Sequence, residues 1–174
     1  KPAMISPLTH IAAAIVSEES DLNETSIQNA ITQVSEFYSL SDILITTPSI
    51  ITDSTVSVSE IESNQLNYGL ILSAISHLGS NDNTDPLEVM EIIAKDASDG
   101  SFDGQDEGQT LLLNDQEISP DFATKDIANS INTLVESLSD QVVVSVDPEF
   151  IFNLETTGGV IENSSIKLSV RALP

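Results

Sequence analysis

The sequence predicts a mainly α-helical fold, a five-helix bundle with a small β element at its C-terminal end. Five segments between residues 6 and 140 place apolar side chains at helical spacing, and several begin with a capping signal. Aromatic residues make up only 4% of the 174 residues and Trp is absent. Aliphatic side chains must therefore fill the core, which favours packing of helices.

The first two helices are predicted near the N-terminus. Ser6 can cap the first helix, and Pro7 suits its first turn. Thr25 or Ser26 can cap the second helix, whose apolar residues again recur every three or four positions. The following residues 43–57 are β-branched and contain a proline, so we expect an extended arm that lies across the helices.

The third helix is predicted from about Ser59 to Leu78. It is apolar over much of its circumference, so we expect it to be the central helix of the bundle. Gly69 within it lowers helix stability relative to Ala by about 1 kcal/mol, which a close helix crossing would explain. Gly79 is the expected stop of this helix.

The remaining elements follow in the same order along the chain. Asp85 and Pro86 open a fourth helix, which leads directly into an acidic loop. After a short β-like run at residues 110–113, a fifth helix opens at Ser119 or Thr124.

We expect the chain to form a helical domain over residues 1–140. The β-rich tail over residues 141–174 either packs on the bundle or leads into a following β domain.

The acidic loop from Asp96 to Gly108 is where residue type and spacing suggest chemistry. Asp99, Ser101 and Asp103 are two residues apart and are followed at once by a glycine, as in the first half of a calcium loop. Oxygen-bearing side chains on alternate residues can converge on a hard cation while the glycine makes the sharp turn. The pattern therefore predicts a calcium site.

The second half of this loop fits a calcium site less well. The twelfth position, which carries a bidentate Glu in an EF-hand, falls on Thr110, so Asp106, Glu107 or a distant carboxylate would have to supply that ligand. The predicted ligand set is Asp99, Ser101, Asp103, Gln105 and Glu107. The alternative is that Asp, Gly and Ser residues simply form an acidic turn after the helix, and the sequence leaves both interpretations open.

The charge balance limits the partners and the location of the protein. Five Lys and Arg residues against 28 Asp and Glu residues give a formal net charge of -23, which repels nucleic acid and anionic membrane surfaces. No apolar run reaches the roughly 18 residues that a membrane span needs, so we expect no membrane insertion. Salt and divalent cations outside a cell would screen this charge, which favours an extracellular or cell-surface protein.

Catalytic candidates are few in this sequence. Cys is absent, the two His residues are far apart, and neither a G-x-S-x-G nor an H-E-x-x-H motif occurs. Paired carboxylates can hydrolyse glycosides, but the scarcity of aromatic residues leaves few platforms for sugars. We therefore expect that the protein is not an enzyme. A carbohydrate- or peptide-binding module and a hydrolase fragment are the alternatives.

Three motifs occur together in the expected helical domain: Ser-Pro-Leu-Thr at 6–9, Tyr-Gly-Leu at 68–70 and Asp-Gly-Ser-Phe-Asp-Gly at 99–104. Together they resemble a helical module of large exported bacterial surface proteins, found beside immunoglobulin-like or cadherin-like repeats. The resemblance covers residues 5–140 and implies a passive structural or adhesive module of the biofilm-associated kind. It implies neighbouring domains of the same protein as partners, and no catalytic residue. The binding-module alternative adds a glycan or protein ligand as a partner. The strong acidity of this chain departs from the pattern.

Overall fold

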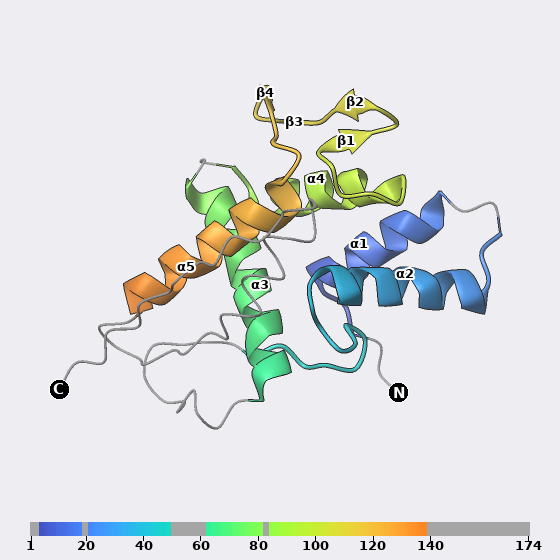
Figure 1. Cartoon of the computed structure of the whole chain (residues 1–174), viewed down its shortest axis with the longest axis horizontal. Coiled ribbons are helices and arrows are strands. Elements are labelled where there is room, and N and C mark those ends of the chain that lie inside the picture. Colours follow the sequence, from blue (N-terminus) through green and yellow to red (C-terminus); the bar gives the residue numbers. More distant parts are fainter. Residues whose placement is uncertain (1–3, 19–20, 50–61, 82–83, 139–174) are drawn as a thin grey trace, which may run out of the picture.

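The computed structural model describes residues 4–18, 21–49, 62–81 and 84–138 (Figure 1). In this part of the chain it confirms a mainly helical fold with five α-helices. The helices are α1 (Pro7–Ser17), α2 (Glu24–Phe37), α3 (Ser63–Asn81), α4 (Pro86–Ser98) and α5 (Ile127–Leu138). The expected β-rich tail at residues 141–174 lies outside the described residues.

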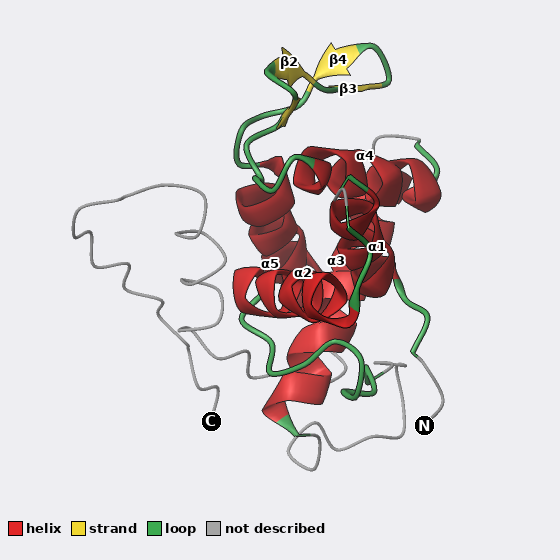
Figure 2. Cartoon of the chain, turned by 90° about the vertical axis from the view of Figure 1, so that its right-hand side faces the viewer, coloured by secondary structure: helices red, strands yellow, loops and turns green. Residues whose placement is uncertain are grey.

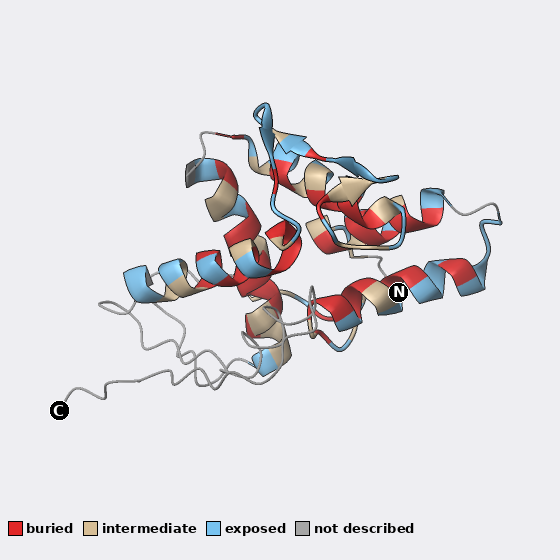
Figure 3. Cartoon of the chain, turned by 45° about the horizontal axis from the view of Figure 1, so that its top comes forward, coloured by how far each residue is buried: buried red, intermediate tan, exposed pale blue. Residues whose placement is uncertain are grey.

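The helices pack as two groups that share α4. α1 packs against α2 and α4, whereas α3 packs against α4 and α5. Figure 3 shows that the buried faces of these helices point toward one another and the exposed faces point outward. The largest fully buried side chains are Leu8, Ile11, Val34, Tyr38, Ile43, Tyr68, Leu70, Ile71, Ile93, Ile127 and Ile131. The expected aliphatic core is therefore confirmed, with two tyrosines added to it.

Local capping signals account for the starts of the first two helices. The Ser6 hydroxyl accepts a hydrogen bond from the Thr9 amide at 3.3 Å, and the Thr9 hydroxyl accepts one from the Ser6 amide at 2.8 Å. The predicted cap of α2 is wrong by two or three residues. Asn23 caps it instead, because its side-chain oxygen accepts from the amides of Thr25 and Ser26 at 2.9 and 3.1 Å.

The third helix continues beyond its predicted end. α3 runs through Gly79 to Asn81, so the prediction that Gly79 stops the helix is wrong. The Gly79 carbonyl accepts from the Thr84 amide at 2.8 Å, and a Cβ on Gly79 would lie 2.8 Å from the nitrogen of Pro86. The glycine is needed because Thr84 and Pro86 lie too close to it to leave room for a side chain.

The central position of α3 is confirmed by its burial. Leu70, Ile71 and Ile75 are at most 2% exposed. We expect Ile75→Ala to lower the free energy of unfolding by about 2–5 kcal/mol, because the lost side chain leaves a cavity in a closely packed core. Urea denaturation measures this loss. Ile45→Ala is the control, since Ile45 is 64% exposed, and an equally small loss in both variants would contradict the central placement.

The arm that was expected over residues 43–57 is described only up to Ser49, and its residues 50–57 lie outside the described residues. Residues 43–45 form a turn rather than an extended segment, and the arm reaches α3 at Gly69 through Ser49. The Ser49 amide donates to the Gln65 carbonyl at 2.9 Å, and a Cβ on Gly69 would lie 2.0 Å from the Ser49 carbonyl oxygen. The expectation of a close helix crossing at Gly69 is therefore wrong. The backbone of the arm, rather than a second helix, lies against this glycine.

Two short β-hairpins lie between α4 and the last helix. β1 (Gln105–Asp106) pairs with β2 (Gln109–Thr110), and β3 (Leu112–Leu113) pairs with β4 (Gln116–Glu117), both antiparallel. The two turn residues of each hairpin have positive φ, as tight two-residue hairpin turns require. Figure 2 shows both hairpins projecting from one end of the helical part. The predicted β-like run at residues 110–113 covers the end of β2, the buried Leu111 and all of β3.

The last helix begins with an irregular turn. A π-helical segment, η2 (Phe122–Asp126), directly precedes α5. Leu111 and Ile118, which flank the second hairpin, are buried and tie it to the helical core together with Phe122. The expected opening of this helix near Ser119 or Thr124 is thus confirmed to within a few residues, with a π-helical rather than an α-helical first turn.

Candidate functional site

Asp96 organises the acidic loop, and it is fully buried at the end of α4. Its Oδ1 atom accepts three backbone hydrogen bonds, from the amides of Asp103 at 3.0 Å, Gly104 at 2.7 Å and Gln105 at 3.2 Å. One carboxylate oxygen therefore holds the turn that leads from the helix into β1. An ion pair between Lys95 and Asp106 at 3.3 Å makes a second connection between α4 and β1.

The five predicted calcium ligands are divided between the turn after α4 and the hairpin of β1 and β2. Asp99 and Asp103 lie in the turn, and each carboxylate accepts a hydrogen bond from the backbone amide two residues further on. Asp99 accepts from the Ser101 amide at 3.0 Å, and Asp103 accepts from the Gln105 amide at 3.1 Å. The Ser101 hydroxyl also donates to Asp99, at 2.7 Å. Gln105 begins β1, and Glu107 is an exposed residue in the hairpin turn.

These contacts favour the interpretation of the loop as an acidic turn. Among the residues that the structure describes, no three His, Cys, Asp or Glu side chains converge in a way that would hold a metal ion. The Asp carboxylates stabilise Asx turns, in which a side-chain oxygen binds an amide two residues further on. The calcium site stays a prediction.

The second carboxylate oxygen of Asp96 has an unusual environment. Within the described residues, Oδ2 of Asp96 and the hydroxyl of Tyr38 are buried without a hydrogen-bond partner. Burial raises the pKa of Asp96 to about 6, against the opposing effect of its three backbone hydrogen bonds, and the nearby charge of Asp103 adds to the rise. Burial also raises the pKa of Tyr38, and the negative charge of Asp96 contributes to that rise.

The stability of the protein should depend on pH through Asp96. Because the folded-state pKa is raised above the ordinary value of 3.8, the folded protein binds this proton more tightly than the unfolded chain. The resulting stabilisation is complete below about pH 3.8 and is lost as the pH rises through about 6. We expect the free energy of unfolding, measured by urea denaturation, to fall over this window.

Asp96→Asn is the variant that isolates this effect. Relief of repulsion among the other carboxylates also stabilises the protein in acid, but that contribution is shared by the wild type and the variant. Asn at position 96 keeps an oxygen acceptor and cannot ionise. The stability difference between the two proteins should therefore change between pH 4 and 6, and a constant difference would contradict the raised pKa.

A groove lies between α2 and the turn that follows α4. Its volume is about 550 Å³. One wall consists of the polar side chains of Asn29, Thr32, Gln33 and Glu36, which occur at i, i+3, i+4 and i+7 on the outward face of α2. The other wall is the segment 100–103. A hydrogen bond of 3.0 Å from the Gln33 side chain to the Gly100 carbonyl joins the two walls.

Two aromatic rings connect these walls. The rings of Phe37 and Phe102 are stacked, with centroids 3.6 Å apart and an angle of 14° between their planes. Phe37 is buried and Phe102 is half-buried, and both line the groove. Tyr38 makes edge contacts with both rings. The groove therefore combines an aromatic floor with polar walls.

The two features that the sequence interpretation missed are the groove and the role of Asp96. A signal for Asp96 was present, because it shares the buried face of α4 with Val89, Ile93 and Ala97. An acidic residue on an otherwise apolar helical face must find donors in the interior. The groove had no comparable signal, since Phe37 and Phe102 are far apart in the sequence.

The two histidines lie on different helices, His10 on α1 and His77 on α3. His10 is exposed on α1. His77 on α3 lies with Nδ1 2.7 Å from the hydroxyl of Ser130, which is buried on α5 and also donates to the Ala74 carbonyl at 3.2 Å. These bonds fasten α5 to α3.

The motifs behind the family resemblance contain residues that hold the fold together. The hydroxyls of Ser6 and Tyr68 are 2.5 Å apart and join the start of α1 to α3. Gly69 leaves room for Ser49 of the arm, and Gly104 donates its amide to the carboxylate of Asp96.

In the described ranges, no helix has the length and apolarity that crossing a bilayer requires. No family model, curated protein or solved structure matches the chain.

Proposed function

We propose that the chain is a non-catalytic, extracellular structural or adhesive module of a bacterial cell-surface protein. The observation that carries this proposal is the use of the acidic loop's side chains. Asp96, Asp99 and Asp103 all bind backbone amides of the loop itself. Acidic side chains that stabilise a turn by binding its backbone are typical of a module with a structural role.

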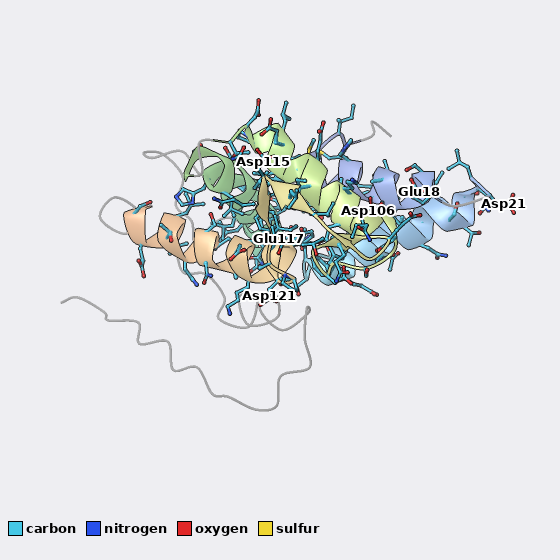
Figure 4. All side chains as sticks on the ribbon, turned by 90° about the horizontal axis from the view of Figure 1, so that it is seen from above. Glu18, Asp21, Asp106, Asp115, Glu117 and Asp121 are labelled. Atoms are coloured by element: carbon cyan, nitrogen blue, oxygen red, sulfur yellow. The ribbon has the colours of Figure 1, made fainter. Side chains whose placement is uncertain are left out.

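The surface charge supports an extracellular location. A net charge of -23 is tolerated best where dissolved ions screen it. Acidic side chains are distributed along the molecule (Figure 4) rather than gathered at one place. Those labelled in the figure are Glu18, Asp21, Asp106, Asp115, Glu117 and Asp121. The partners of such a module are the neighbouring domains of a larger surface protein.

Antibody labelling of intact cells tests the location. Antibodies raised against the 174-residue chain should label intact cells of the source bacterium, and protease added outside the cells should remove the label. Labelling that requires permeabilised cells would refute the surface location. A panel of polysaccharide and peptide substrates tests the absence of catalysis, and turnover of any of them would favour the hydrolase alternative.

Calcium is a proposed stabiliser of this module. If the acidic loop binds calcium, millimolar calcium should raise the melting temperature, since a ligand that binds only the folded state stabilises it. The double variant Asp99→Ala and Asp103→Ala should abolish the increase. Magnesium at equal concentration and ionic strength is the control for general screening. An equal response to both ions, or an unchanged response of the variant, would leave only an acidic turn.

A carbohydrate- or peptide-binding module is the second candidate, and the groove beside α2 favours it. Its volume of about 550 Å³ lies within the range of roughly 300–1,000 Å³ that ligand sites occupy. A glycan and peptide array separates this candidate from a purely structural module. Reproducible capture of one ligand class by the whole chain would favour the binding function.

A further inference from the structure

The groove between α2 and the segment 100–103 carries negative charge on both sides. Glu36 lines the α2 wall and Asp103 lines the opposite wall, and both side chains are exposed. The ion pairs found in the described residues join Lys95 to Asp106 and Lys125 to Asp121. Neither Lys nor Arg lines the groove, so its two carboxylates lack a cation among the lining residues.

The floor of the groove is suited to a flat or apolar group. Phe102 is held in place by its stacking on Phe37, and the bond from Gln33 to Gly100 fixes the backbone two residues before it. Its half-buried ring leaves part of the aromatic surface open to the groove. An aromatic face attracts cations, and it attracts the planar guanidinium of arginine especially well.

The polar walls add hydrogen-bonding groups for an extended backbone. Asn29, Thr32 and Gln33 carry amide and hydroxyl groups along the same wall as Glu36. The side-chain amides and the hydroxyl can each donate and accept hydrogen bonds. They can therefore bind the N–H and C=O groups of a partner's backbone on either side of a side chain that enters the groove. The strongly negative whole chain would also attract a basic segment from a distance.

We propose that this groove binds an arginine side chain of a partner polypeptide, with the guanidinium between Glu36 and Asp103 and against the ring of Phe102. The apolar stem of the arginine lies along the aromatic floor, and the polar residues of α2 bind the flanking backbone. This inference goes beyond the surface-module role and does not rest on it. Cell labelling tests that role, whereas the groove is tested by peptide binding in solution.

The test uses the whole chain and two matched peptides. One is an acetylated and amidated Gly-Ser-Arg-Ser-Gly peptide, and the other carries citrulline, a neutral analogue of arginine, at the centre. Amide chemical shifts in NMR spectra report where each peptide binds. The arginine peptide should shift the amide signals of Gln33, Gly100, Ser101 and Phe102 in a saturable way at low ionic strength. The citrulline peptide should leave them nearly unchanged.

Three variants separate a built site from general charge attraction. Glu36→Gln should weaken binding of the arginine peptide about fivefold, as expected for loss of one exposed ion pair worth about 1 kcal/mol. Glu117→Gln makes the same change on the exposed strand β4, outside the groove, and should leave the affinity nearly unchanged. Phe102→Leu keeps an apolar side chain but removes the ring, and it should also weaken binding while circular dichroism stays helical.

Several outcomes would overturn the proposal. One is the absence of saturable shifts at the groove, and another is an equal response to the citrulline peptide. Equal weakening by Glu36→Gln and Glu117→Gln would assign the binding to net charge alone. If a neutral disaccharide such as maltose shifts the groove signals and the arginine peptide does not, the occupant is a sugar and the proposed ligand class is wrong.

Discussion

Replacing Gly69 with Ala is expected to destabilise the protein by about 3 kcal/mol or more, toward the upper end of the cost of overpacking. The added Cβ would lie 2.0 Å from the carbonyl oxygen of Ser49 and 3.0 Å from its carbonyl carbon. A backbone carbonyl cannot rotate away as a side chain can. The hydrogen bond from the Ser49 amide to the Gln65 carbonyl resists a shift of the arm away from α3. The higher helix propensity of Ala, about 1 kcal/mol, offsets only part of this cost.

Ser76→Ala is the matched control for this substitution. Ser76 is exposed on the same helix, so it tests helix propensity without a clash. Urea denaturation of both variants should show a large loss for Gly69→Ala and a change within about 0.5 kcal/mol for Ser76→Ala. Equal stabilities of the two variants would mean that the arm does not press against α3 at this position.

Asp96→Ala is expected to lower the free energy of unfolding by roughly 2–4 kcal/mol at neutral pH. The substitution removes the acceptor of three backbone amides, and a buried donor without a partner costs about 1–3 kcal/mol. The bond from the Gly104 amide is buried, whereas the bonds from the Asp103 and Gln105 amides are partly open to water, which satisfies these amides at lower cost. The Gln105 amide also keeps the Asp103 carboxylate as an acceptor. Removal of a buried ionised group offsets part of the loss.

Asp99→Ala is the control for the loss of an acidic residue from the same loop. Asp99 is exposed, and within the described residues its carboxylate binds only Ser101, two residues further on. Its removal should cost under about 1 kcal/mol, as for most surface substitutions. Asp96→Asn should retain much of the stability that Asp96→Ala loses, since the amide oxygen still accepts hydrogen bonds. If Asp96→Ala is no more damaging than Asp99→Ala, Asp96 does not hold the loop.

The existence and order of the helices could be predicted because their signals are local. Ser6 and Pro7 start α1, and Asp85 and Pro86 start α4, through bonds and dihedral angles within one turn. The boundary of α2 was less accurate, since Asn23 lies close to two other residues that also favour caps. Its side chain reaches two amides at once, and this geometry decides among neighbours of similar preference.

The candidate site could be predicted only in part, because some of its signals are local and others depend on contacts between separate elements. The acidic loop was expected from Asp96 and is found after α4, although Asp96 to Ser98 still belong to the helix. Its approximate place could be predicted because glycines and acidic residues favour turns in any context. Its interpretation as one continuous loop missed the hairpin formed by β1 and β2. Pairing of such short strands depends on the turn at Glu107 and Gly108 and on attachment to α4 through Asp96 and Lys95.

The sequence by itself determined which segments are helical, which faces are apolar, and how strongly the surface is charged. These properties depend on residue type and on spacing within a few positions. Only the tertiary structure decided that Gly69 faces Ser49, that Asp96 binds three amides, and that Phe37 stacks on Phe102. Each contact joins residues from different elements. Periodicity specifies that a face must be buried, but the partner that buries it is set by how whole helices and connections pack together.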